Sequence, residues 1–111
     1  DTRTVLKIPL SLAPIKIAIL PLTKKDGLPE KAIKIMEDLK FDFNCQYEEK
    51  DSIGKRYRRQ DAIGTPFCIT IDNETEKDDC VTLRFRDSMK QERIKISSIN
   101  DLISKKLKQK Y

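Results

Sequence analysis

The run Ile15-Lys16-Ile17-Ala18-Ile19-Leu20 is apolar at every position except Lys16, and Pro21 follows it. A strand with one face in water alternates apolar and polar residues, whereas this run is apolar on both faces. We therefore expect a strand that is covered on both sides, as in an α/β sheet. After the turn pair Asp26-Gly27, the apolar spacing from Leu28 to Leu39 predicts a helix with one buried stripe.

Strand and helix patterns continue to alternate after this helix. The segment from Asn44 to Glu48 predicts a short second strand, and the alternation from Phe67 to Ile71 predicts a third. Between them, Ser52 and Gly64 are suitable caps for a second helix over residues 53–63. Because strand–helix–strand order gives parallel strands with right-handed crossovers, we expect this part of the sheet to be parallel.

The last third of the chain predicts antiparallel strands and a closing helix. Residues 72–79 are expected to form a polar turn, since they include five acids. Two alternating runs, Val81–Phe85 and a second ending at Ile96, predict a β-hairpin, and a helix is expected from Ser98. The expected fold class is α/β: a three-layer α/β/α domain with a mixed five-stranded sheet and three helices.

The length of 111 residues predicts one domain. We expect residues 1–12 to be a connecting arm and residues 13–111 to be the domain itself. The sequence begins with Asp1 and not with Met, which predicts that it is a piece of a longer protein.

The composition excludes several kinds of chemistry. The absence of histidine excludes Ser-His-Asp and Cys-His catalysis and histidine-bound metals. The three cysteines, Cys45, Cys68 and Cys80, form no CxxC pair, which argues against zinc, and their odd number favours a reducing, cytoplasmic setting. No apolar run approaches the ~18 residues that span a membrane. We therefore expect no catalytic residue, no metal site and no membrane contact.

The net charge of +5 conceals two arginine-rich segments that alternate with acidic ones. Arginine suits RNA because its planar guanidinium binds phosphate through two hydrogen bonds and stacks on bases. The alternation in residues 81–86 predicts that Arg84 and Arg86 point outward from an exposed sheet face, opposite Leu83. The other interpretation is that Arg56 and Arg59 pair with Asp61 or with the acidic segments. The two segments hold Arg56, Arg58, Arg59, Arg84, Arg86 and Arg93.

Three segments carry a resemblance to a known family. The stretch Ser52-Ile53-Gly54-Lys55-Arg56-Tyr57-Arg58-Arg59-Gln60-Asp61-Ala62-Ile63-Gly64-Thr65-Pro66-Phe67 closely resembles the S-I-G-[RK]-R-Y-x-R-x-D-x-I-G-x-x-F segment of α2-type glycyl-tRNA synthetases. Residues 13–22 resemble the A-P-x-K-x-x-x-L-P-L entry strand of that family. Residues 81–93 resemble its T-x-R-x-R-D-[ST]-M-x-Q-x-R hairpin. Together the matches span most of residues 13–96.

The resemblance implies the fold of the class IIa anticodon-binding domain, at the C-terminus of a glycine–tRNA ligase. The parent enzyme would make glycyl-adenylate from glycine and ATP with magnesium and then charge glycine tRNA. Its class II catalytic motifs would lie upstream, and it would form a homodimer through that catalytic core. No cofactor is expected in residues 1–111 themselves.

The hairpin suggests how the anticodon would be read. Glycine anticodons end in two cytosines, whose edges need a carboxylate or carbonyl for the N4 amino group and donors for N3 and O2. Tyr57 is expected in the core. The residues predicted to contact the cytosines are Arg84, Arg86, Asp87 and Gln91, and those predicted to bind phosphate or stack on bases are Lys55, Arg56, Arg58, Arg59 and Arg93.

Two other functions fit the same module. One is a synthetase-derived accessory subunit of mitochondrial DNA polymerase, which would bind DNA and lack the cytosine-reading hairpin. The other is a protein-interaction domain. The intact run Arg84-Phe85-Arg86-Asp87 favours the tRNA function over both.

Overall fold

The computed structural model places the first apolar run in the middle of the sheet. Strand β1 (Ile17–Pro21) is buried along its whole length, as predicted. It pairs in parallel with β2 (Cys45–Tyr47) on one side and with β3 (Phe67–Ile71) on the other. The structure describes residues 15–86, 88 and 90–108. The predicted arm, residues 1–12, and the first residues of the predicted domain lie outside this part.

Two antiparallel strands complete the sheet. Strand β4 (Cys80–Phe85) runs antiparallel to β3, and β5 (Gln91–Lys95) runs antiparallel to β4. The strand order is β2-β1-β3-β4-β5, so β2 and β5 form the two edges. This confirms the mixed five-stranded sheet.

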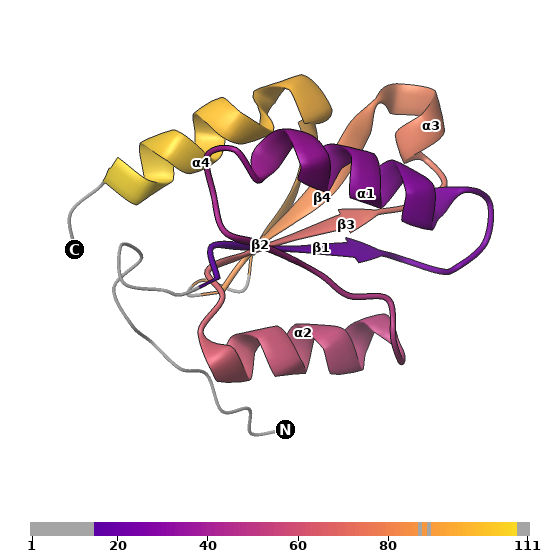
Figure 1. Ribbon diagram of the computed structural model, residues 1–111, viewed down its shortest axis with the longest axis horizontal. Coiled ribbons are helices and arrows are strands. Elements are labelled where there is room, and N and C mark those ends of the chain that lie inside the picture. Colours follow the sequence, from indigo (N-terminus) through magenta and orange to yellow (C-terminus); the bar gives the residue numbers. More distant parts are fainter. Residues whose placement is uncertain (1–14, 87, 89, 109–111) are drawn as a thin grey trace.

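Helices cover both faces of the sheet and give the predicted three layers (Figure 1). Helix α1 (Leu28–Leu39) and helix α4 (Ile99–Lys108) lie on one face, and α2 (Ile53–Ile63) lies on the other. A 3₁₀ turn (Ile96–Ser98) leads into α4, which begins directly after Ser98, the residue predicted as its cap.

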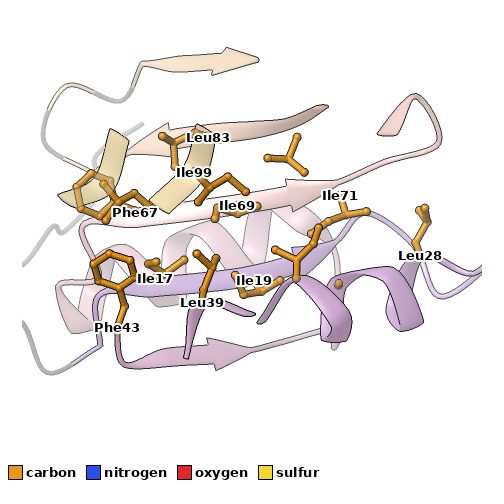
Figure 2. Packing of buried hydrophobic residues seen from close by; sticks show 14 residues of the cluster. Ile17, Ile19, Leu28, Leu39, Phe43, Phe67, Ile69, Ile71, Leu83 and Ile99 are labelled. Carbon is orange, nitrogen blue, oxygen red and sulfur yellow. The ribbon is translucent and has the colours of Figure 1, made fainter. Parts of the chain in front are cut away.

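The larger core lies between the sheet and the pair α1 and α4 (Figure 2). Because strand side chains alternate between faces, β1 directs Ile17 and Ile19 into this core and Ala18 and Leu20 toward α2. A smaller cluster beneath α2 contains these last two residues and Cys68, with Ile53 and Tyr57 packed against it. Tyr57 is thus part of the core, as predicted. This smaller core packs α2 against β1 and β3.

The turn expected over residues 72–79 contains a short helix, α3 (Thr75–Asp78), which the sequence pattern did not predict. Its start depends on one carboxylate. Asp72 Oδ1 accepts the backbone N–H groups of Glu74 at 3.0 Å and of Thr75 at 3.2 Å. These bonds satisfy donors that a helix start leaves without partners.

Candidate nucleic-acid interface

Helix α2 carries most of the predicted phosphate-binding cations, and its two ends are fixed as the sequence predicts. Ser52 Oγ accepts the backbone N–H of Lys55 at 3.3 Å, and Gly64 ends the helix with a φ of 83°. The helix then divides its arginines between two sides. Arg56 faces the protein interior, whereas Arg58 and Arg59 face solvent. One motif therefore contains arginines with different physical roles.

Arg56 is a structural residue, and its predicted contact with phosphate is wrong for this geometry. Its side chain is only 2% exposed. Nη1 donates to the carbonyl of Pro21 at 2.6 Å and to that of Glu48 at 3.1 Å, while Nη2 donates to Leu22 at 3.1 Å. Burial lowers the pKa of this guanidinium. Arg56 thus ties α2 to the segments that leave β1 and β2.

Arg84 was expected to point outward, and it does not. The face of β4 opposite Leu83 lies beneath α2, so Arg84 is 4% exposed. Its two Nη atoms donate to the carboxylate of Asp61 at 2.8 and 3.0 Å, and Asp61 is 0% exposed. The guanidinium also lies 4.8 Å from the ring centre of Tyr57. The hydrogen bonds that Arg84 donates to Asp61 raise the pKa of Arg84. This is the pairing with Asp61 that the sequence left open as an alternative, made by a different arginine.

Arg86 is also enclosed by protein, at 3% exposure, so its predicted outward position is wrong as well. Its Nη1 donates to the carbonyl of Gly64 at 2.7 Å, and its backbone N–H donates to Pro66 at 2.9 Å. These bonds join the end of β4 to the segment between α2 and β3. Arg84 and Arg86 therefore hold the hairpin against α2.

Arg59 is exposed, as an RNA contact requires, but two carboxylates hold it. It forms ion pairs with Glu48 and with Asp51, the latter at 2.9 Å, and it donates to the carbonyl of Lys50 at 3.1 Å. The hydrogen bonds to Asp51 and Glu48 raise the pKa of Arg59, and the bond from Arg59 lowers the pKa of Asp51. A phosphate would have to compete with both acids for this side chain.

Arg93 on β5 repeats this arrangement with one acid that precedes α3 and one that ends it. Its guanidinium contacts the carboxylate of Asp72 at 2.9 and 3.0 Å and that of Asp78 at 3.1 Å. The bond from Arg93 lowers the pKa of Asp78. These acids come from the segment predicted as a polar turn, so the acidic stretch serves as a partner for β5.

Lys55, Arg58 and Gln91 keep the exposure predicted for them. Lys55 and Arg58 lie three residues apart on the solvent side of α2, and neither makes an ion pair with another residue in the described part of the chain. We call Lys55, Arg58 and Arg59 the α2 surface. Gln91 lies opposite Arg84 in the β4–β5 register, and therefore on the same side of the sheet as α2.

Asp87, the predicted acceptor for a cytosine amino group, lies outside the described residues. The sequence also did not indicate a hollow of about 620 Å³ between β2 and α2. Gln46, Lys50 and Gln60 line it beside the α2 surface. The only sequence signal for it was the shortness of the second strand, because a short edge strand leaves part of a helix flank uncovered.

Residues 15–86, 88 and 90–108 contain no group of three or more cysteine, aspartate or glutamate side chains placed to bind a metal ion. In the same ranges, no helix combines the length and apolar character that a membrane span requires.

A model of the family described as "Anticodon binding domain" matches residues 16–106. The chain is also 54% identical over 108 residues to the glycine–tRNA ligase of Alkaliphilus oremlandii (strain OhILAs), a match that covers 97% of this chain and 23% of that protein. It is 55% identical over 107 residues to the glycine–tRNA ligase of Clostridium perfringens (strain 13 / Type A), covering 96% of this chain and 22% of that protein. The chain thus spans less than a quarter of the length of these curated relatives.

Solved structures share the fold at low sequence identity. The RNA binding domain of threonyl-tRNA synthetase from Cryptosporidium parvum Iowa II superposes with a TM-score of 0.80 at 22% identity, covering 89% of this chain and 25% of that one. Prolyl-tRNA synthetase from Cryptosporidium parvum superposes with a TM-score of 0.83 at 19% identity, covering 92% of this chain and 22% of that one. These matches confirm the predicted class of fold.

Proposed function

This chain belongs to the anticodon-binding domain family, and we propose that it recognises the anticodon of glycine tRNA as the C-terminal domain of a glycine–tRNA ligase. The observation that carries the proposal is the similarity to glycine–tRNA ligases over nearly the whole chain. Neither of the two ligases compared above, nor either solved structure, is a DNA polymerase subunit. The longer enzyme would act in the cytoplasm as a homodimer joined through its catalytic core.

The proposed enzyme would activate glycine with ATP and magnesium outside the described residues. The residues described here offer no metal-binding cluster, so no step of that chemistry is assigned to them. Their contribution would be to bind and position the tRNA. Correct positioning accelerates a reaction because the reactants no longer have to find one another by diffusion.

The proposed phosphate contacts are exposed to solvent, whereas the arginines that support them are buried. Lys55 and Arg58 are the cations open to phosphate, and Arg59 would join them if it exchanged its acids for RNA. Gln91 and Asp87 remain the proposed readers of cytosine edges. The buried arginines would act indirectly, because they fix α2 and the hairpin relative to each other. They are Arg56, Arg84 and Arg86.

The phosphate contacts are tested in the full-length enzyme with Lys55→Ala and Arg58→Ala. Each variant should weaken binding of glycine tRNA by a similar factor whatever the anticodon, because phosphates carry no sequence information. Each lost phosphate contact should also reduce the slope of log affinity against log salt by about 0.7–0.9. Filter binding over a range of salt concentrations measures both quantities.

The matched control is Lys34→Ala, which removes the same charge from an exposed site on α1, in the opposite layer. It should leave affinity and salt slope unchanged. In the same assay, Asp87→Ala and Gln91→Ala should reduce the preference for glycine tRNA over a tRNA whose anticodon cytosines are replaced. Unchanged preference in both variants, or preferential binding to duplex DNA, would contradict the proposal.

A further inference from the structure

Phe41 is the most exposed large apolar side chain in the described part of the protein. It is 84% exposed, whereas Leu22, Ile33 and Ile63 are only 41–44% exposed. It lies in the connection between α1 and β2 and has no place in the tRNA surface proposed above. An aromatic ring that buries little of its surface within its own domain can serve as an anchor for a partner, since aromatic side chains contribute much of the binding energy at interfaces.

Hydrogen bonds across the turn join the residues that precede Phe41 to those that follow it. The N–H groups of Asp42 and Phe43 donate to the carbonyl of Leu39 at 3.1 and 3.0 Å. Asn100 of α4 donates to the Asp42 carboxylate at 2.7 Å. The next residue, Phe43, points into the core beside Ile17 and Leu39 (Figure 2). These bonds order the backbone of the turn that carries Phe41, which lowers the entropy cost of binding through it.

The ring lies close to the point where the described chain enters the sheet. The backbone N–H groups of Lys16 and Ile17 donate to the carbonyl of Asn44 at 2.9 and 3.3 Å. A hollow of about 300 Å³ lies here, lined by Lys16, Phe41 and Asn44 among others. In Figure 1 the start of β1 and the connection from α1 to β2 lie at the same end of the sheet. The described part of the chain therefore begins beside this hollow, which Lys16 lines.

The charges around the ring favour a protein partner over RNA. Lys40 is paired with Glu37 at 2.7 Å, and the carboxylate of Asp42 adds a negative charge next to Phe41. A surface for RNA needs an excess of cations, as on α2, because phosphate contacts supply most of the binding. An apolar centre with a balanced polar rim is instead the composition of a protein–protein interface.

We propose that Phe41 and the hollow beside it form a docking site for the upstream part of the glycine–tRNA ligase polypeptide. The inference rests on the proposed function, since it requires the longer enzyme. The relatives supply the necessary chain, because residues 1–111 match only 22–23% of their length. A partner tethered by a short flexible linker has an effective concentration in the millimolar range, so docking requires a dissociation constant only below about 1 mM.

Hydroxyl-radical footprinting of the full-length, unsubstituted enzyme tests the docking. Without tRNA, Phe41 should be modified about as slowly as Phe67, which is 2% exposed, and Leu22 should be modified rapidly as an exposed reference. Docking that protects Phe41 by at least tenfold corresponds to about 1.4 kcal/mol. Rapid modification of Phe41, or protection that appears only after tRNA is added, would overturn the proposal.

Photocrosslinking identifies the partner. The photoreactive analogue p-benzoylphenylalanine at position 41 should crosslink to a peptide upstream of residue 15, whereas the same analogue at position 22 should not. A crosslink to tRNA, a crosslink to residues 15–108 of a second copy, or no crosslink would contradict the docking site. Glycylation of tRNA by the unsubstituted enzyme is measured separately. If the unsubstituted enzyme does not glycylate tRNA, the proposed function is refuted. If it is active but gives no crosslink from position 41, only the docking is refuted.

Discussion

Arg84 shows that the position of a residue, and not its type, decides what it can bind. Its guanidinium and the carboxylate of Asp61 form two hydrogen bonds inside the protein. The pair exposes almost nothing to solvent. A buried charge loses its hydration, so each member of the pair depends on the other for stability.

We predict that Arg84→Met destabilises the chain by about 3–5 kcal/mol, because Asp61 would then be buried without its cation. Adding Asp61→Asn should cost less than the sum of the two single changes, since neither charge would remain. Arg93→Met is the control: its side chain is 32% exposed, and ion pairs at such sites contribute about 0–1 kcal/mol. Urea denaturation gives the free energies of unfolding. Equal losses in Arg84→Met and Arg93→Met would contradict the prediction.

The sequence predicted the side of β4 that carries Arg84 but not its burial. Alternation with Val81, Leu83 and Phe85 correctly places Arg84 on the opposite face. Whether a helix covers that face depends on long-range packing of α2, which no local pattern encodes. The same limit applies to Arg56, since its carbonyl partner at Pro21 is 35 residues away in the chain.

At the scale of elements, the glycine inside α2 and the glycine that caps its end should respond to substitution in opposite directions. Gly64 has a φ of 83°, which a side chain disfavours, so Gly64→Ala should destabilise the chain by about 1 kcal/mol. Gly54 lies in the first turn, and a Cβ there would meet no atom within 4 Å. Gly54→Ala should therefore stabilise the chain by up to about 1 kcal/mol. Thermal unfolding of both variants measures the difference, and changes of the same sign would refute this account.

Elements with strong local signals were predicted to within a residue or two. The caps Ser52 and Gly64 fixed the bounds of α2, and the apolar runs located β1 and β3. Helix α3 was missed because its start depends on Asp72 accepting two backbone N–H groups, and five acids in one segment are also typical of a turn. A helix of four residues is also too short for the apolar spacing of a helix to repeat in its sequence.

At the scale of the whole molecule, two exposed arginines each join neighbouring segments through an acid whose pKa is lowered. The bond from Arg59 lowers the pKa of Asp51, and the bond from Arg93 lowers that of Asp78. A carboxylate with a lower pKa in the folded state stabilises the fold above its unfolded pKa of about 3.9. That contribution to stability disappears as the pH falls through the pKa of the carboxylate in the folded state.

The free energy of unfolding should therefore decrease as the pH falls below about 4. Combining Arg59→Gln with Arg93→Gln should make this decrease shallower, because both acids would then titrate nearer their ordinary values. Lys34→Gln, the same type of change on α1, should not alter the profile. Urea denaturation at a series of pH values measures it. An unchanged profile in the double variant would show that these ion pairs do not couple to folding.

Strand β5 has a further consequence for crowded conditions, where many copies of the chain meet. It is an edge of the sheet, so its outer backbone groups could pair with an edge strand of another copy and start aggregation. Its sequence, Gln91-Glu92-Arg93-Ile94-Lys95, contains one aliphatic residue among charged and polar ones. An incoming strand would have to desolvate these charges. The residues of β5 therefore help to keep the protein dispersed.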